Sequence, residues 1–364
     1  MKISKHHYAL ELARRGNTVY FIEPPSLEYS SVTIIPSIDH ERIHIVRYKP
    51  VYRGKRFLPA FIFRRMLKKQ VKILLKKIGA VPQLTWCFEP YRFENLEWFG
   101  EGISIFHAMD LFSYQQLPPE VFSADICLGV SDTIVKELSS SGKKIFFINH
   151  GLSGVFAEQA EKSMTSLSNV SINRKNKVVG YSGNLLMQAM DRSVMKDVIS
   201  KHPDLKFIFW GQFEHGKGGL IGHKDQETDD FIAFLKSAPQ VELRGPVSSA
   251  QLAEEMKQVD LFWICWKTGV TKTWDGSNSH KLLEYLSYGK PIVSHFVSTY
   301  AGRDLFYMLP GSNNQHYPEL FDQVLHSIDE EPTELRKKRI AFALDNTYCL
   351  QVSRIESIIN ATTL

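Results

Sequence analysis

The stretch SNSHKLLEYLSYGKPIVS, from Ser277 to Ser294, contains a loop, an expected helix, a sharp stop and a short apolar segment. Ser277, Asn278 and Ser279 are residue types that cap helix N-termini, so we expect the helix to begin at one of them. Gly289 suits a left-handed helix end, and the proline two residues later prevents continuation. The expected buried face consists of Leu282, Leu283, Tyr285 and Leu286.

Lys281 and Glu284 are three residues apart, so a helix directs both toward one region of space. A helix start with hydroxyls, an amide and a lysine suits a diphosphate, because unpaired N–H groups and the helix dipole favour anions. A surface helix carrying an ordinary Lys–Glu pair has the same spacing, and the spacing alone does not separate the two interpretations.

The string KLLEYLSYGKPIV resembles the donor-site helix of GT-B fold glycosyltransferases, whose pattern is roughly K-x-x-E-Y/A-x-x-x-G-K-P-V. The resemblance implies that Lys281 faces the diphosphate of a sugar nucleotide and that Glu284 faces its ribose hydroxyls. Retaining members carry a second glutamate eight residues earlier, where this chain has Gly276 beside Asp275. The resemblance therefore favours an inverting enzyme, similar to the bacterial polysaccharide glucuronosyltransferases.

Length and composition are those of a folded protein with two domains: 364 residues, 43% of them hydrophobic. The four cysteines are scattered, without the spacing of a disulfide framework or a zinc site, which suits a reducing cytoplasm. No apolar run reaches the ~18 residues that span a bilayer. We expect a cytoplasmic protein.

The net charge of +5 is unevenly distributed, because Arg53 to Lys77 holds ten basic residues and no acid. Within the segment 57–78, a helix would place lysines and arginines on one side and apolar residues on the other. Such a helix can lie on an anionic membrane surface, or its apolar face can pack on its own domain. Aromatic residues are not interleaved with the cations, which argues against nucleic acid.

The N-terminal half alternates expected helices and strands, which indicates a parallel sheet. A helix over 5–15 and a strand over 18–22 resemble the segments that follow the first strand of GT-B proteins, but no first strand precedes them here. Further strands are expected over 43–48, 83–88, 103–107, 125–129 and 144–148.

Asp110 follows one of these strands, and ligands meet open α/β sheets at strand ends. Residues 103–156 resemble the second half of a GT-B N-terminal domain, and the resemblance gives Asp110 the role of catalytic base. Glu89 and His107 are alternatives, and Asp110 can instead cap a turn. His150 is expected to hold a loop at the domain junction.

The second half repeats the pattern after a polar segment, 161–176, that we interpret as a linker. Gly183 and Asn184 follow a strand over 178–182 and precede a helix near 191–201, a junction at which backbone N–H groups can approach a phosphate. Many relatives carry basic residues at this turn. This chain does not, so Lys281 and Lys267 are expected to supply the positive charge.

Arg244, on a strand over 241–246, can stack on a nucleotide base or cover the sheet edge. The sequence has no D-x-D-like acidic pair in a suitable loop that would indicate a metal site. We expect no metal or other cofactor. The expected domains are 1–160 for the acceptor and 177–344 for the nucleotide sugar, with a last helix over 345–364 crossing back to the first domain.

Together these features predict an α/β protein of the GT-B fold, with two Rossmann-like domains facing a cleft. The resemblance implies transfer of a sugar from a UDP-sugar to a saccharide or lipid-linked acceptor in cell-surface polysaccharide synthesis, in the cytoplasm and peripherally on the inner membrane face. A non-hydrolysing sugar-nucleotide epimerase and a non-catalytic partner subunit of the same fold remain alternatives.

Overall fold

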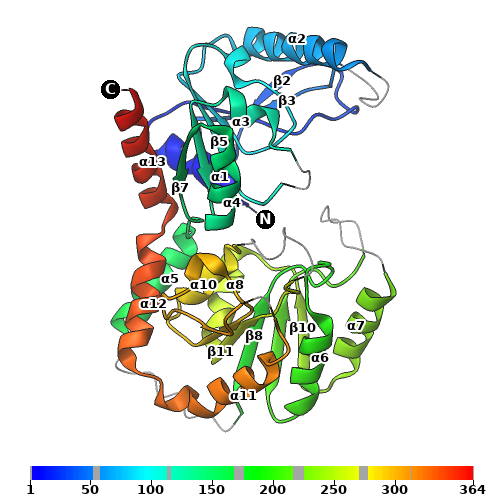
Figure 1. Ribbon diagram of the computed structural model, residues 1–364, viewed down its shortest axis with the longest axis vertical. Helices are drawn as coiled ribbons and strands as arrows, with labels where there is room; N and C mark the ends of the chain where they lie inside the picture. The colour runs from blue at the N-terminus through cyan, green and yellow to red at the C-terminus, as the bar shows by residue number, and fades with distance from the viewer. Residues whose placement is uncertain are drawn as a thin grey trace. The chain divides into compact units, whose positions relative to one another are not determined.

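The computed structural model describes residues 2–51, 58–112, 116–167, 176–215, 225–269, 278–311 and 313–363. Their contacts divide the chain into two compact units, which Figure 1 shows. The N-terminal unit holds Lys2–Asn149 and Tyr348–Leu364, and the C-terminal unit holds His150–Thr347. The segment expected as a linker, 161–176, begins inside a helix of the C-terminal unit, and its residues 168–175 lie outside the described part of the chain.

The C-terminal unit is built on one parallel sheet with the strand order β10-β9-β8-β11-β12-β13. Its strands are β8 (Val178–Ser182), β9 (Lys206–Trp210), β10 (Val241–Gly245), β11 (Leu261–Ile264), β12 (Ile292–Ser294) and β13 (Tyr307–Met308). All residues of β8 and β11 are buried, as expected for central strands covered by helices on both faces. Numbered within the unit, the order is 3-2-1-4-5-6, the doubly wound arrangement in which ligands bind where the strand order reverses, between β8 and β11.

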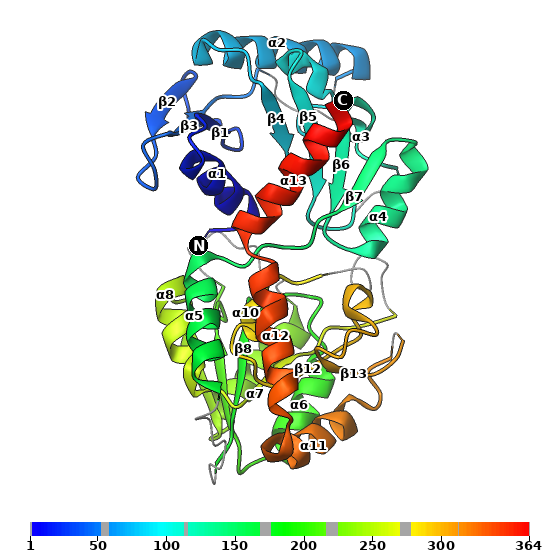
Figure 2. The same ribbon diagram turned by 90° about the vertical axis from the view of Figure 1, so that its left-hand side faces the viewer.

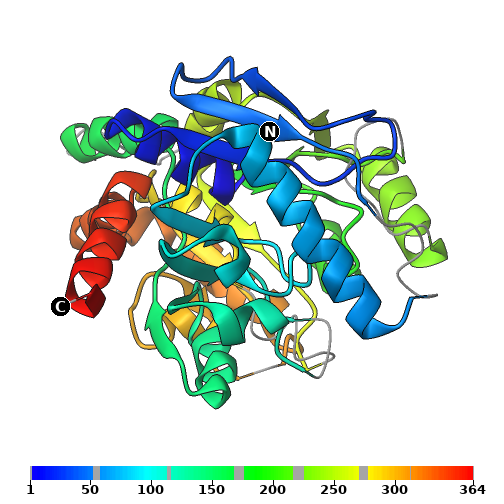
Figure 3. The same ribbon diagram turned by 90° about the horizontal axis from the view of Figure 1, so that it is seen from above.

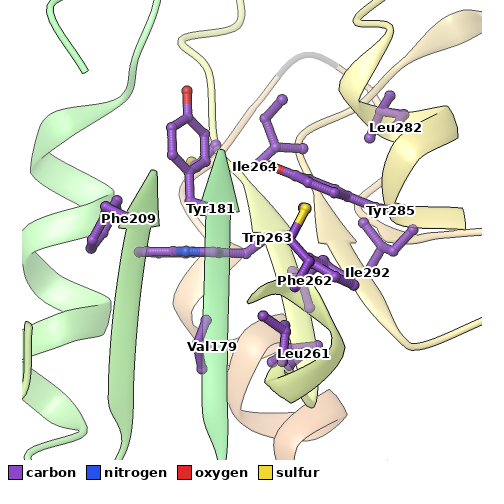
Figure 4. Packing of buried hydrophobic residues seen from close by; sticks show 14 of the residues in the cluster. Val179, Tyr181, Phe209, Leu261, Phe262, Trp263, Ile264, Leu282, Tyr285 and Ile292 are labelled. Carbon is purple, nitrogen blue, oxygen red and sulfur yellow. The ribbon is translucent and has the colours of Figure 1, made fainter. Parts of the chain in front are cut away.

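The helices of this unit are α5 (Gly154–Thr165), α6 (Arg192–Lys201), α7 (Gln226–Ser237), α8 (Ser249–Glu255), α10 (Lys281–Leu286), α11 (Tyr317–Ser327) and α12 (Thr333–Asp345). Short 3₁₀ segments cover Met256–Gln258, Ser298–Tyr300 and Ile328–Glu330. Figure 4 shows the core beneath α10, where the ring of Tyr285 stacks on Phe262 of β11 with centroids 4.6 Å apart.

A buried polar network fixes the end of α10 to α12. Arg339 and Glu331 are both 1% exposed at their side chains and form an ion pair of 2.7 Å. Arg339 also donates to the backbone oxygens of Leu305 at 2.8 Å and Gly289 at 3.3 Å. Gly289 has a φ of +67°, the left-handed conformation that the sequence predicted for the end of this helix.

The N-terminal unit divides its strands between two sheets, where the sequence suggested one. The three-stranded sheet has the order β1-β3-β2, and the four-stranded parallel sheet has the order β4-β5-β6-β7. The strands are β1 (Val19–Ile22), β2 (Thr33–Pro36), β3 (Ile43–Arg47), β4 (Leu84–Cys87), β5 (Ile103–Ala108), β6 (Ile126–Gly129) and β7 (Lys144–Phe147). Two of the described strands were not predicted from the sequence. One is β2, which runs antiparallel to β3, and the other is β13 of the C-terminal unit.

The helices of the N-terminal unit are α1 (Ser4–Arg14), α2 (Ala60–Ile78), α3 (Pro119–Ser123), α4 (Asp132–Leu138) and α13 (Tyr348–Thr363), with 3₁₀ segments over Leu96–Phe99 and Ser139–Ser141. The last helix, α13, packs on α1 (Figure 2). The side chain of Arg15, just after α1, donates to Ser353 at 2.9 Å and forms an ion pair with Glu356. The C-terminal residues therefore belong to the unit that contains the first helix.

Candidate functional site: a glycine turn and a lysine at the strand ends

The turn after β8 lies at the carboxyl end of the C-terminal sheet, next to the ends of two neighbouring strands. The Gly183 N–H donates to the backbone oxygen of Trp210 at 2.7 Å, and the Gly211 N–H donates to that of Gly245 at 2.8 Å. A β-carbon on Gly211 would lie 1.9 Å from the oxygen of Gly183, so only glycine permits this approach of the two backbones. The close contact fixes the backbone of the turn against the ends of the neighbouring strands.

Asn184 has a local partner in this turn. Its side-chain Oδ1 accepts a hydrogen bond from the Leu186 N–H at 3.0 Å, as in an Asx turn. Leu185 and Leu186 are fully buried. Asn184 therefore shapes the turn, and its expected contact with a nucleotide stays a prediction.

The helix α10 begins at Lys281, later than the sequence predicted. Its N-cap is His280, with no side-chain capping bond, so the expectation that Ser277, Asn278 or Ser279 starts the helix is wrong. Ser277 lies outside the described residues, as do Asp275 and Gly276. With only six residues, α10 has a small dipole, so attraction of an anion must depend mainly on the lysine.

Tyr285 connects α10 to the end of β8. The Ser182 N–H donates to the Tyr285 hydroxyl at 2.8 Å, and the hydroxyl groups of the two residues are 3.3 Å apart. Tyr285 is fully buried, as are Leu282, Leu283 and Leu286. The helix α10 is thereby held against the end of β8.

The structure brings Gly183 and Lys281 together. A β-carbon placed on Gly183 would lie 2.7 Å from Cε of Lys281 and 2.8 Å from the hydroxyl of Tyr181. The ammonium of Lys281 also lies over the ring of Trp266, 6.0 Å from its centroid. A glycine, which has no side chain, and a cationic group are therefore in contact at the point where the strand order reverses.

Glu284 lies one turn along α10, with a side chain that is 17% exposed. Burial raises the pKa of its carboxyl group to about 7, an effect that the nearby charge of Lys281 opposes. A ring nitrogen of His280 lies 4.0 Å from the carboxylate. Glu284 is thus poised to change its charge near neutral pH.

Two further cations named from the sequence are held by carboxylates. Arg244 pairs with Glu242 at 2.6 Å and with Glu255 at 2.8 Å, and it lies over the ring of Trp210. These contacts match the interpretation in which Arg244 covers the sheet edge. Lys267 pairs with Glu227 at 2.9 Å.

His150 contacts the loop that precedes α10. Its ring Nε2 lies 2.7 Å from the backbone oxygen of Asn278, and its ring meets that of His280 edge-on at 6.2 Å. Asn278 and Ser279 are both 7% exposed. His150 thus holds this loop, as expected, and Asn278 and Ser279 lie next to Lys281.

The residues expected to act in the N-terminal unit lie at or near strand ends. Asp110 is exposed, two residues beyond the end of β5. Glu89, beyond the end of the neighbouring β4, is bound by Lys5. His107 is fully buried among the rings of Tyr8, Trp86 and Phe88, with centroids 5.4 to 5.9 Å away, which favours Asp110 as the accessible group.

The sequence analysis missed Tyr181 and Trp266. Tyr181 is the fourth residue of β8, and burial raises the pKa of its hydroxyl to about 12. Trp266 comes two residues after β11 and stacks on His295 with centroids 5.3 Å apart. Their places near the carboxyl ends of the two central strands were the signal that could have identified them.

Neither a metal site nor a membrane-spanning helix is found among the residues that the structure describes. No group of three or more His, Cys, Asp or Glu side chains among them is arranged to hold a metal ion. None of their helices is long and apolar enough to cross a membrane.

Comparison with solved structures identifies the fold. A glycosyltransferase from Rickettsia africae ESF-5 matches with a TM-score of 0.67 at 12% identity, over 99% of this chain and 94% of that chain. Sucrose-phosphate synthase from Thermosynechococcus elongatus matches with a TM-score of 0.63 at 12% identity, over 97% and 92%. Anabaena Alr3699/HepE in complex with UDP matches with a TM-score of 0.60 at 12% identity, over 89% and 87%.

These neighbours share the GT-B fold, so the predicted fold is confirmed. Protein-family models gave no match to the chain, and a search of the curated proteins gave none either. At such low identity the structural likeness establishes the fold only.

Proposed function

We propose that the protein is a glycosyltransferase whose C-terminal unit binds a nucleotide-diphosphate sugar, most specifically a UDP-sugar. The contact between the Gly183 turn and Lys281 carries this proposal, because an ammonium group at the carboxyl ends of the central strands suits a diphosphate. The neighbour HepE was solved with UDP and with UDP-glucose, which supports the choice of base. Glu284, on the same helix, would accept hydrogen bonds from the ribose hydroxyls.

In this scheme Lys281 stabilises the negative charge that develops on the leaving diphosphate as the glycosidic bond breaks. The chain's own residues supply that charge stabilisation in the proposal, which includes no metal. Asp110, exposed beyond β5, accepts the proton of the acceptor hydroxyl as that oxygen attacks C1, and the anomeric configuration inverts. We propose a saccharide or lipid-linked acceptor, in cell-surface polysaccharide synthesis.

Isothermal titration with UDP, GDP and uridine tests the donor assignment directly. We expect UDP to bind and Lys281→Ala to weaken UDP binding at least ~10-fold while leaving the weaker uridine binding nearly unchanged. Lys290→Ala is the matched control, since Lys290 binds the backbone oxygens of Lys257 and Val259 away from the turn. Equal binding of UDP by wild type and Lys281→Ala would contradict the assignment.

Turnover assays distinguish a glycosyltransferase from an epimerase and from a non-catalytic subunit. Asp110→Asn is expected to bind UDP like the wild type and to lose transfer. Nuclear magnetic resonance of a UDP-sugar incubated without acceptor would show epimerisation if the protein were an epimerase, and lasting absence of any turnover would instead favour a non-catalytic subunit. Adding a chelator is expected to leave transfer unchanged.

We also propose that α2 attaches the protein to an anionic membrane surface. Seven cations of this helix are exposed: Arg64, Arg65, Lys68, Lys69, Lys72, Lys76 and Lys77. Its apolar face packs within the N-terminal unit through Phe63, Leu67, Val71 and Leu74, each at most 3% exposed. Figure 3 shows α2 as the light blue helix on the outside of that unit.

Because the apolar face is already buried, the attraction would be chiefly electrostatic. Each lysine or arginine near an anionic surface contributes about 1 kcal/mol, and salt weakens the effect. Phe61, which is 75% exposed at the start of α2, offers an apolar contact beside the charges. The proposed enzyme would thus remain near a membrane-bound acceptor.

Co-sedimentation with vesicles tests this surface. We expect binding to vesicles that contain phosphatidylserine, no binding to phosphatidylcholine alone, and loss of binding when Lys68, Lys69 and Lys72 are changed to glutamate. The control changes Lys337 and Lys338, exposed on α12, to glutamate. Equal binding to vesicles with and without phosphatidylserine would exclude the proposed attachment.

A further inference from the structure

A buried carboxylate holds the loop that follows β4 in the N-terminal unit. Glu120, on α3, is fully buried. Its carboxylate oxygens accept hydrogen bonds from the backbone N–H groups of Tyr91, Phe93 and Glu94, each at 3.0 Å. Tyr91 and Glu94 adopt φ values of +61° and +63°, the left-handed conformation that residues other than glycine rarely adopt. The residue between these fixed positions that extends from the loop is Arg92.

This loop is costly to form, and it lies where ligands meet parallel sheets. Burying a carboxylate and holding two residues in a left-handed conformation both cost free energy, and such strain is concentrated at ligand-binding sites. The loop follows the carboxyl end of β4, next to the end of β5 from which Asp110 follows. The Tyr91 hydroxyl also donates to the backbone oxygen of Gln116 at 3.1 Å, which ties the loop to the segment after Asp110.

Neutral groups hold the guanidinium of Arg92 in place. Its Nη2 donates to the backbone oxygen of Glu23, just beyond β1, and its Nε donates to the Tyr48 hydroxyl at 3.4 Å. The guanidinium also lies over the rings of Tyr48 and Phe93, 5.8 and 5.1 Å from their centroids. These contacts fix the position of the cation before any ligand binds.

The charge of Arg92 is not paired with a carboxylate of any residue that the structure describes. The carboxylates closest to it in the fold bind other cations, since Glu23 pairs with Arg47 at 2.9 Å and Glu89 pairs with Lys5. Arg92 is partly exposed, and its Nη1 donates to none of the described residues. Guanidinium groups form strong, charge-assisted hydrogen bonds to phosphates and carboxylates. A fixed arginine with an unused nitrogen therefore suits an oxyanion.

We propose that Arg92 binds an oxyanion of the acceptor, either a phosphate or a carboxylate group, at the strand ends of the N-terminal unit. The identification of this ligand as an acceptor rests on the proposed function, whereas the anion site itself does not. Arg92 and Asp110 follow the neighbouring strands β4 and β5, so the bound anion would orient the acceptor relative to the proposed base. Arg92 would thus determine specificity, because a neutral acceptor offers the guanidinium no charge.

Titration followed by nuclear magnetic resonance tests the anion site without any turnover. The probes are glucose 1-phosphate, glucuronate and glucose, added to the Lys281→Ala variant so that the proposed diphosphate site does not compete for the phosphate. We expect an anionic probe to shift the amide signals of Tyr91 and Phe93 and to bind at least ~10-fold more tightly than glucose. Tighter binding of glucose 1-phosphate would identify a phosphate-bearing acceptor, and tighter binding of glucuronate would identify an acceptor with a sugar carboxylate.

Adding Arg92→Gln to the same background should weaken binding of the anionic probes at least ~10-fold and leave glucose unaffected. Arg92→Lys, which keeps the charge, should retain part of the affinity. The matched control is Arg42→Gln, since Arg42 is exposed at the amino end of β3 and donates to the oxygen of Gly16 at 3.2 Å. The amides that Glu120 binds should stay protected from hydrogen exchange in each variant, which shows that the loop is folded.

The inference fails if neither anion shifts the loop amides, if glucose binds as tightly as the anions, or if Arg92→Gln binds them unchanged. UDP titration keeps this result separate from the proposed function. UDP binding that is unaffected by Arg92→Gln, together with a negative result for the probes, would overturn the anion site alone. Failure of UDP to bind the unmodified protein would overturn the proposed donor site and leave the anion site standing.

Discussion

Replacing Gly183 with alanine should weaken UDP binding by displacing Lys281, even though alanine carries no charge. The new β-carbon would lie 2.7 Å from Cε of Lys281 and 2.8 Å from the hydroxyl of Tyr181. Both distances are shorter than any ordinary contact, and the tyrosine is fully buried, so the flexible lysine must move. The overpacking, together with the positive φ of +156° at this position, should cost about 1–3 kcal/mol of folding stability.

The loss of affinity follows from the displacement of the ammonium group. At an effective dielectric constant of about 20, moving two unit charges from ~3 to ~4.5 Å apart costs about 2 kcal/mol. That energy corresponds to roughly thirtyfold in the dissociation constant. Gly154→Ala is the control within the same unit, because nothing lies within 4 Å of a β-carbon there.

A double-mutant cycle with Lys281→Ala makes the prediction specific. Isothermal titration of UDP should show that Gly183→Ala weakens binding in the wild type but has little further effect once Lys281 is alanine, a coupling of more than ~1 kcal/mol. If Gly183→Ala weakens binding equally in both backgrounds, the lysine is not the group through which the glycine acts. The proposed diphosphate site would then be wrong in its main feature.

Three further predictions concern stability and pH. Arg339→Met should lower the free energy of unfolding by about 3 kcal/mol in urea denaturation, because the buried Glu331 loses its nearest cation and keeps only Arg336 at 3.8 Å and the Tyr307 hydroxyl at 3.0 Å. Lys338→Met on the exposed side should change it by under ~0.5 kcal/mol. The folded-state pKa of Glu284 is raised to about 7, so its burial costs stability progressively as pH rises from about 4.5 to 7. Glu284→Gln should therefore be more stable than the wild type at pH 8 and no more stable at pH 4, and equal differences at both values would exclude this titration. Tyr285→Phe should keep its ring stacking but lose about 1 kcal/mol with its hydroxyl, together with UDP affinity, as denaturation and titration would show.

Much of the local structure was predictable because it depends on neighbouring residues. The stop after α10 followed from Gly289, which adopts a positive φ. The buried strands followed from apolar runs that end in glycine or a charged residue. The start of α10 was placed too early, because three good capping residues precede Lys281 and the sequence alone does not show which backbone turn the tertiary contacts select.

The partners of charged side chains were not predictable in the same way. Arg244 pairs with a residue two positions away and with another eleven positions away, and Lys267 pairs with Glu227 forty positions earlier. The sequence permitted both a nucleotide contact and an edge position for Arg244. The choice depends on which carboxylates the fold brings within reach, a property of the tertiary arrangement.

The same distinction applies to the basic helix. An amphipathic pattern requires that the apolar face be covered, and it is equally compatible with protein or lipid as the cover. In α2 the cover is protein, because Phe63, Leu67, Val71 and Leu74 pack within the N-terminal unit. The charged face is then the part of α2 available for a membrane, so the proposed attachment is chiefly electrostatic.

The candidate site shows how a buried core can define a binding surface. Gly183 and Lys281 are nearly a hundred residues apart, and no local preference brings them together. Their contact is set by Tyr285, whose ring packs on Phe262 while its hydroxyl accepts the Ser182 N–H. Because dense cores resist small displacements, the helix that carries the lysine is positioned before any ligand arrives. Such preorganisation is what a diphosphate site needs, since charges already in place need no reorganisation when the leaving group forms.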